Sequence, residues 1–149
     1  AYLRDAFPSP YTLDDANRFI AMAIGSSSGA SADMAPGMLR AIEVNGKCVG
    51  GISIGLLDDV YRKTAEIGYW LAEPFWGRGI VTNAVLALVP VAFERFDIVR
   101  LQAGVFANNP ASMRVLEKCV FTREAVLKNA ITKNGIVMDE VMHARFRDE

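Results

Sequence analysis

Apolar and polar residues alternate along three consecutive segments in the first half of the chain, at residues 38–44, 47–57 and 64–71. A period of two is typical of β-strands with one buried face. Asn45-Gly46, between the first two segments, is a strong hairpin signal. We therefore expect an antiparallel meander of three strands, in which Gly50 and Gly51 mark a bulge or a close approach of two backbones.

The apolar period then changes to three or four, which predicts a helix over residues 79–96. Its expected buried side chains are Val81, Val85, Leu88, Val89, Ala92 and Phe93. Pro90 should kink this helix or mark its weakest turn. Residues 98–106 form the next expected strand, and the strand–helix–strand connection makes it parallel to residues 64–71.

The last third predicts a second helix over residues 110–119 and a terminal hairpin of residues 123–132 and 136–146. At the other end, residues 12–24 indicate a helix capped by Thr12, and residues 25–37 a flexible loop rich in Ser, Gly and Ala. There is no internal repeat. Residues 1–149 are therefore expected to form a single domain built on a mixed α+β sheet.

Composition narrows the classes of function. The 149 residues are 52% hydrophobic, which suits one domain with a sizeable core. The net charge of −1, without a run of Lys or Arg, predicts neither a nucleic acid nor a membrane surface as partner. No stretch reaches the roughly 18 apolar residues of a membrane span, and no signal peptide opens the chain, so we expect a cytoplasmic location.

The chain has two cysteines, Cys48 and Cys119, and one histidine, His143. The cysteines lack the spacing of metal ligands, and both fit small buried side chains better. His143 has no acidic cluster around it in the sequence, so a structural role is expected. We predict no metal cofactor.

The most informative feature is a glycine-rich turn, Trp76-Gly77-Arg78-Gly79, between the strand that ends at Leu71 and the long helix. Strand, Gly-x-Gly and helix in this order direct several backbone N–H groups at one spot, and the helix N-terminus adds a partial positive charge. We interpret the turn as the diphosphate-binding site of a nucleotide-derived cofactor.

Two common diphosphate motifs fit poorly. A Rossmann fingerprint requires a third glycine where Thr82 stands, and repeated βαβ units where this chain has hairpins. A P-loop requires Gly-Lys-Ser/Thr, which is absent. The cofactor is therefore expected to be neither a dinucleotide nor a nucleoside triphosphate.

The chain instead resembles the GNAT superfamily of acetyl-CoA-dependent N-acetyltransferases, and within it the ribosomal-protein alanine acetyltransferases of RimJ/RimL type. Four stretches carry the resemblance, at residues 10–20, at 66–71 running into 76–79, at 108–121, and in the terminal hairpin with Asn134-Gly135 and Asp139. The implied fold is a mostly antiparallel sheet with a splayed parallel strand pair and flanking helices. The family's first strand and first helix have no counterpart in this chain.

The resemblance implies acetyl-CoA as co-substrate. Leu71 would offer backbone contacts to the pantetheine arm, the amides of residues 76–82 would bind the pyrophosphate, and Asn109 would hydrogen-bond the arm. Asn109 is equally typical of a helix cap. The implied cofactor-binding residues are Leu71, Trp76, Gly77, Arg78, Gly79, Ile80, Val81, Thr82 and Asn109. Val81 departs from the family motif, which has a smaller residue at its position.

Two side chains are implied to be catalytic. Glu66 matches a position that serves as general base in relatives, although a strand glutamate that faces solvent or pairs with Arg fits too; Glu73 is a weaker candidate. Ser112 would donate to the leaving thiolate, or would bond only its own helix. Tyr69 is expected to pack in the sheet or to line the acceptor cleft.

The expected reaction is direct transfer of an acetyl group from acetyl-CoA to a primary amine, with a protein or peptide N-terminal α-amine as acceptor. The alternatives are a small amine, such as an amino acid, a polyamine or an aminoglycoside-like compound, or an acyl-CoA-binding module without catalysis. The loops at residues 26–36, 58–63 and 133–134 would set the acceptor. A monomer and a homodimer both remain open.

Overall fold

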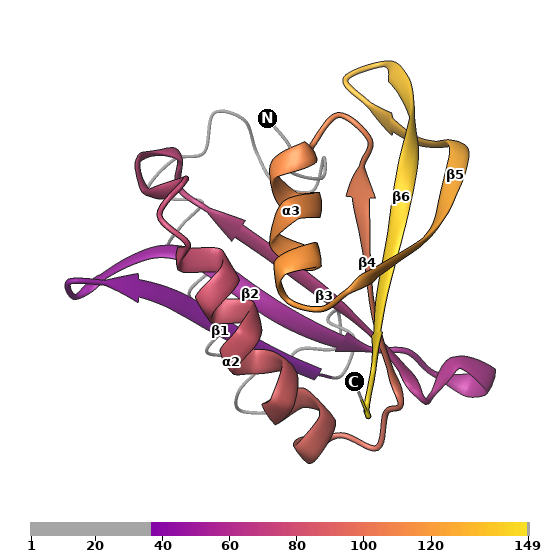
Figure 1. Ribbon diagram of the computed structural model, residues 1–149, viewed down its shortest axis with the longest axis horizontal. Coiled ribbons are helices and arrows are strands. Elements are labelled where there is room, and N and C mark those ends of the chain that lie inside the picture. The colour runs from indigo at the N-terminus through magenta and orange to yellow at the C-terminus, as the bar shows by residue number, and fades with distance from the viewer. Residues whose placement is uncertain (1–36, 149) are drawn as a thin grey trace.

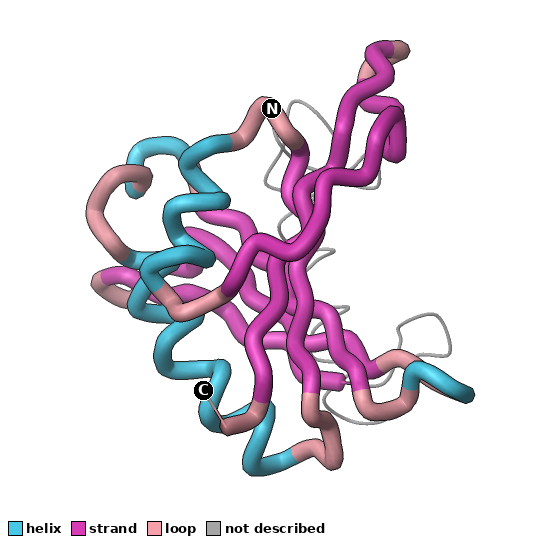
Figure 2. The backbone as a smooth tube through the Cα atoms, turned by 45° about the vertical axis from the view of Figure 1, so that its right-hand side comes forward, coloured by secondary structure: helices cyan, strands magenta, loops and turns pink. Residues whose placement is uncertain are grey.

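The computed structural model describes residues 37–148, which form one six-stranded sheet in the order β1-β2-β3-β4-β6-β5. Two helices, α2 and α3, lie against one face of the sheet (Figures 1 and 2). The helix expected at residues 12–24 and the loop expected at residues 25–36 lie outside the described residues.

Each strand and helix that the sequence predicts from residue 38 onward is present. The strands are β1 (Gly37–Val44), β2 (Lys47–Leu56), β3 (Thr64–Leu71), β4 (Arg100–Phe106), β5 (Thr122–Lys133) and β6 (Ile136–Phe146). The helices are α2 (Ile80–Arg95) and α3 (Pro110–Lys118), and two short 3-10 turns, η1 (Asp59–Tyr61) and η2 (Glu73–Phe75), were not expected.

The bulge and the close approach expected near Gly50 are both found. Ile42 pairs with Gly50 and Glu43 pairs with Cys48, so that Val49 is the extra residue of a bulge in β2. A Cβ atom at Gly50 would collide with the carbonyl oxygen of Trp70 on β3. Only glycine therefore allows β2 and β3 to stay paired up to the end of β3.

The two parallel strands pair over only a short length. β3 and β4 are in register at Thr64 with Arg100, Ala65 with Leu101 and Glu66 with Gln102. Beyond Glu66, β3 continues beside β2 to its end and β4 continues beside β6. The strands therefore separate into a gap that is closed at Glu66 and open at their carboxyl ends (Figure 1). This is the splayed pair that the sequence predicts.

The hydrophobic core lies between the sheet and the two helices. α2 buries five of its six predicted positions, Val85, Leu88, Val89, Ala92 and Phe93, and half-buries Val81. Pro90 does not end the helix, which runs uninterrupted from Ile80 to Arg95. The proline lies on the exposed face, where water can bond the carbonyl that its missing N–H leaves without a partner.

His143 is fully buried on the helix-facing side of β6, beside the core. Its Nδ1 lies 3.3 Å from the carbonyl oxygen of Val141, which can only accept, so Nδ1 carries the proton of the neutral ring. Burial lowers the pKa of His143 below its ordinary value of 6.5. The residue therefore has the structural role that the sequence predicts.

This burial predicts how stability depends on pH. Below about pH 6.5 the unfolded chain protonates His143 while the folded chain resists protonation, so stability decreases as the pH falls through that range. We expect the melting temperature to fall less steeply between about pH 7.5 and about pH 5 in His143→Leu than in the parent, measured by calorimetry. Only the two slopes are compared, because the substitution also changes absolute stability. Equal slopes would show that His143 is not held neutral.

Candidate active site

The turn between β3 and α2 is held by its own side chains and by β2. The indole Nε1 of Trp76 donates to the carbonyl oxygen of Leu71 at 2.7 Å. The N–H of Ala72 donates to the carbonyl of Val49 at 2.8 Å, which attaches the turn to the bulge in β2. The guanidinium of Arg78 lies 5.4 Å from the centre of the Phe75 ring. The turn is therefore fixed before any ligand binds.

The N-terminus of α2 presents a set of backbone donors. Gly77 and Gly79 have φ of +70° and +74°, a conformation that other residues rarely adopt. Gly79 is the N-cap and has no side chain to bond the helix, and the first bond within the helix runs from Asn83 N–H to the Gly79 carbonyl. The N–H groups of residues 80–82 therefore have no acceptor within the helix.

Nothing in the first turn of α2 competes for these donors, because it contains no acidic residue. The side chain of Val81, which departs from the family motif, packs against the core, so its extra bulk is accommodated there. Residues 77–82 thus form an open anion-binding site of the kind that suits a diphosphate. We call this set of backbone donors the amide cradle.

Main-chain groups of β3 border the gap. The bond from Ala72 to Val49 fixes the alternation of the antiparallel β2–β3 pair. It follows that the N–H and C=O groups of Ile67, Tyr69 and Leu71 point away from β2, toward the gap. The Leu71 carbonyl is engaged by Trp76, which leaves its N–H for a ligand.

The other border of the gap is β4. The bond from Ala107 N–H to the Asp139 carbonyl fixes the alternation of the β4–β6 pair, so the main-chain groups of Gly104 and Phe106 point toward the gap. The gap therefore has peptide donors and acceptors on both sides. An extended molecule that contains amide groups can pair with such edges as a strand would.

Ser112 lies on the helix-facing side of this gap, in contact with Tyr69 of β3. Their hydroxyl oxygens are 2.8 Å apart, and the Tyr69 hydroxyl also reaches the Ser112 carbonyl at 3.3 Å. Burial raises the pKa of Tyr69 to about 12, so this hydroxyl stays protonated and can donate. The Ser112 hydroxyl thus bonds Tyr69 across the fold, a contact that the sequence did not predict.

Asn109 is the N-cap of α3. Its Oδ1 accepts a bond from the backbone N–H of Ser112 at 3.2 Å, as expected for a helix cap. The Asn109 amide group still has its Nδ2 donors for a ligand. The structural reading of Asn109 is therefore correct, and the binding reading stays a prediction.

Glu66 lies on the opposite face of the sheet, at the last paired position before the gap. Its Oε1 accepts a bond from Nε2 of Gln102 at 3.1 Å. Gln102 in turn accepts from Nε of Arg100 at 3.0 Å, and Arg100 forms a bidentate ion pair with Glu124. Glu66 therefore neither faces solvent without contacts nor pairs directly with an arginine. Glu73 is exposed in η2.

The predicted site residues thus fall into three groups around β3. The amide cradle lies beyond its carboxyl end, Ser112 lies on its helix-facing side, and Glu66 lies on its other face. Strand alternation explains the last two positions, because Glu66 and Tyr69 are separated by an odd number of residues. The structure therefore brings all of the predicted residues to the borders of one gap.

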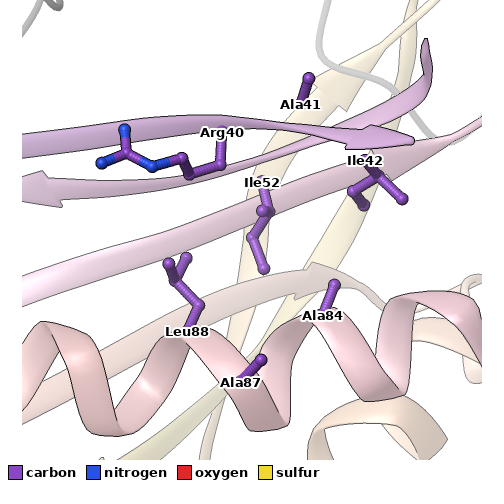
Figure 3. Close-up of a pocket in the computed structure, with 7 residues that line it drawn as sticks. All are labelled: Arg40, Ala41, Ile42, Ile52, Ala84, Ala87 and Leu88. Carbon is purple, nitrogen blue, oxygen red and sulfur yellow. The ribbon is translucent and has the colours of Figure 1, made fainter. Parts of the chain in front are cut away.

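A pocket of about 240 Å³ lies elsewhere, between β1, β2 and α2 (Figure 3). Its lining is apolar apart from Arg40, whose guanidinium bonds the Leu39 carbonyl at 2.8 Å. It contains none of the predicted site residues, and no chemistry is assigned to it.

Within residues 37–148, no three His, Cys, Asp or Glu side chains gather closely enough to hold a metal ion. None of the helices in this range is both long and apolar enough to cross a membrane.

Comparison with known proteins matches residues 1–122 to the family model of the acetyltransferase (GNAT) domain. YdaF of Bacillus subtilis (strain 168), provisionally named a ribosomal N-acetyltransferase, is 36% identical over 105 residues, which are 70% of this chain and 57% of YdaF. The ribosomal-protein-serine acetyltransferase of Escherichia coli (strain K12) is 34% identical over 100 residues, 67% of this chain and 55% of that protein. The chain spans about half the length of the curated relatives it matches.

Solved structures share the fold. RimL, named a ribosomal alpha-N-protein acetyltransferase and solved in complex with coenzyme A, matches with a TM-score of 0.75 and 28% identity, over 92% of this chain and 74% of RimL. The microcin self-immunity acetyltransferase MccE, in complex with acetyl-CoA and AMP, matches with a TM-score of 0.75 and 29% identity, over 91% of this chain and 72% of MccE. With a family model that covers more than half of its length, and with this fold, the chain belongs to the acetyltransferase (GNAT) domain family.

Proposed function

We propose that this chain is an acetyl-CoA-dependent N-acetyltransferase domain whose acceptor is the α-amine of a protein or peptide N-terminus. One observation carries the proposal: the amide cradle and the peptide-lined gap follow one another along β3 and the turn after it. A cradle for a diphosphate that continues into a channel for a chain with amide groups matches the chemistry of coenzyme A.

In this proposal the chain binds acetyl-CoA through its backbone. The amides of residues 77–82 hold the pyrophosphate, and the guanidinium of Arg78 adds positive charge at the rim. The N–H of Leu71 and the Nδ2 of Asn109 bond the pantetheine arm. RimL and MccE, which share the fold, were solved with coenzyme A and acetyl-CoA respectively, and this supports the assignment.

The acceptor must be a neutral amine to attack. An α-amine has a pKa of about 8 and is roughly a quarter neutral at about pH 7.5, whereas a lysine side chain, with a pKa of about 10.4, is less than about 1% neutral. A modest base such as Glu66 therefore suffices for an α-amine. The relatives named as acetyltransferases of ribosomal proteins support the same class of acceptor.

The two catalytic side chains act from opposite faces of the sheet. As the amine nitrogen bonds the acetyl carbon, Glu66 takes the proton of the nitrogen and the carbon–sulfur bond breaks. The Ser112 hydroxyl donates a hydrogen bond to the leaving thiolate. Tyr69 donates to Ser112 Oγ, which leaves the serine proton available for the sulfur. Holding both reactants in one gap supplies most of the rate enhancement.

The cradle can be tested by calorimetric titration with acetyl-CoA, with NAD as the control ligand. We expect micromolar binding of acetyl-CoA and none of NAD. Gly79→Glu should abolish binding, because it places a carboxylate at the anion site. Gly46→Glu is the matched control, since Gly46 has nearly the same φ, +75°, but lies in the β1–β2 turn. If Gly79→Glu remains folded and binds acetyl-CoA like the parent, the cradle assignment is wrong.

The acceptor class can be tested with two peptides of one sequence that contains a lysine. One peptide has a free N-terminus and the other a blocked one, and mass spectrometry locates the acetyl group. We expect acetylation of the free α-amine and little or none of the lysine at about pH 7.5. Polyamines and amino acids serve as competing acceptors. Preferential acetylation of these small amines would contradict the peptide proposal, and no transfer to any amine would leave a binding module.

The Tyr69–Ser112 pair can be tested by measuring kcat. Ser112→Ala should lower kcat by about tenfold or more, because the thiolate loses a donor. Tyr69→Phe should lower it by roughly three- to tenfold, through the lost hydrogen bond. In the Ser112→Ala background, Tyr69→Phe should have no further effect. Tyr61→Phe is the control, because Tyr61 is 64% exposed in η1. Independent effects of the two substitutions would contradict the pairing.

A further inference from the structure

Gln102 is the only glutamine in the chain and was not among the predicted site residues. It stands opposite Glu66 at the last position where β3 and β4 pair, at the closed end of the gap. Its side chain is half-buried, and its Nε2 donates to Glu66 Oε1 at 3.1 Å. The contact therefore lies at the carboxylate that the proposed function makes the base.

Arg100 fixes the orientation of the Gln102 amide. The Nε of Arg100 can only donate, so the atom of Gln102 that it contacts at 3.0 Å must be the carbonyl oxygen Oε1. The amide nitrogen of Gln102 is then directed at Glu66. A rotated amide would place a donor against Arg100 and an acceptor against the carboxylate, and both contacts would be lost.

Arg100 is itself held in place from β5. Glu124 stands at the irregularity between Arg123 and Ala125, where it is not part of the strand register. Its Oε1 accepts from Nη1 of Arg100 at 2.9 Å, and its Oε2 accepts from Nη2. This bidentate pair raises the pKa of Arg100 and lowers that of Glu124, so both groups stay charged.

We propose that Gln102 is a positioning residue for the general base: Arg100, anchored by Glu124, orients the Gln102 amide, and the amide holds the Glu66 carboxylate toward the acceptor amine. This inference rests on the proposed function, in which Glu66 accepts the proton. Glu66 Oε1 is engaged by Gln102, and Oε2 is the oxygen that receives the proton of the amine.

A neutral amide suits this task better than a cation. A guanidinium in direct contact would stabilise the ionised carboxylate strongly and would make it a weaker proton acceptor. The amide restricts the carboxylate through one hydrogen bond and keeps the charge of Arg100 one side chain away. On this face of β3 to β6, the described charged groups around Glu66 are Arg100, Glu124 and Glu140, and the last lies against Gly104.

The test is steady-state kinetics of the full chain with acetyl-CoA and the peptide of free N-terminus. Gln102→Met keeps the length of the side chain and removes its polar groups. We expect kcat to fall about tenfold, with the KM and the calorimetric affinity for acetyl-CoA unchanged. The acid limb of the kcat/KM profile should move to higher pH, because the ionised carboxylate loses a donor. Gln102→Glu should lower kcat further, although it could still bond Arg100.

A double-mutant cycle with Glu66→Gln separates positioning from packing. If Gln102 acts through Glu66, then Gln102→Met has no further effect in the Glu66→Gln background. The control is Ser53→Ala, on the same face of the neighbouring strand β2. An equal loss in both backgrounds, or a parental pH profile in Gln102→Met, would overturn the inference while Glu66→Gln still marks the base. A fully active Glu66→Gln would instead overturn the base assignment and the inference with it.

Discussion

The site depends on one constraint, that β3 and β4 can pair at only three positions before each is committed to another strand. β3 stays on β2 to its last residue, because Gly50 permits the close approach and Ala72 bonds the bulge. β4 pairs with β6 along its whole length. Neither strand can lean toward the other, so a gap opens between them. The peptide groups that face this gap carry the cost of lacking a partner strand, and a ligand with amide groups relieves it.

β3 organises the chemistry because its alternation and its direction are both used. Alternation places Tyr69 on the side of the helices and Glu66 on the opposite face, so one strand reaches both sides of the gap. Direction places the amide cradle immediately after its carboxyl end, where the gap is widest. A diphosphate held there directs the attached arm back along the strand toward Glu66. The order of residues along one segment thus becomes the order of functions in space.

Features that depend on neighbouring residues could be predicted from the sequence. Periodicity located the strands and helices, Asn45-Gly46 located the first hairpin, and the glycine-rich turn located the cradle. The contacts of Tyr69 with Ser112, and of Glu66 with Gln102, could not be predicted, because their partners lie 43 and 36 residues away. Both contacts depend on how α2 carries the chain from β3 to β4 and on the register in which the strands meet. No local period contains that register.

The two proposed reacting groups are both controlled by neutral donors. The phenol of Tyr69 contacts Ser112 and the amide of Gln102 contacts Glu66, whereas the charged pair of Arg100 and Glu124 stays one side chain away from the carboxylate. A direct ion pair would orient a carboxylate equally well but would weaken it as a base. The negative diphosphate poses the opposite problem, since it requires positive potential and no proton transfer. Backbone dipoles at the start of α2 meet that need without a titratable group. The division between dipoles at the cradle and hydrogen-bonded side chains in the gap follows from what each end of the proposed reaction demands.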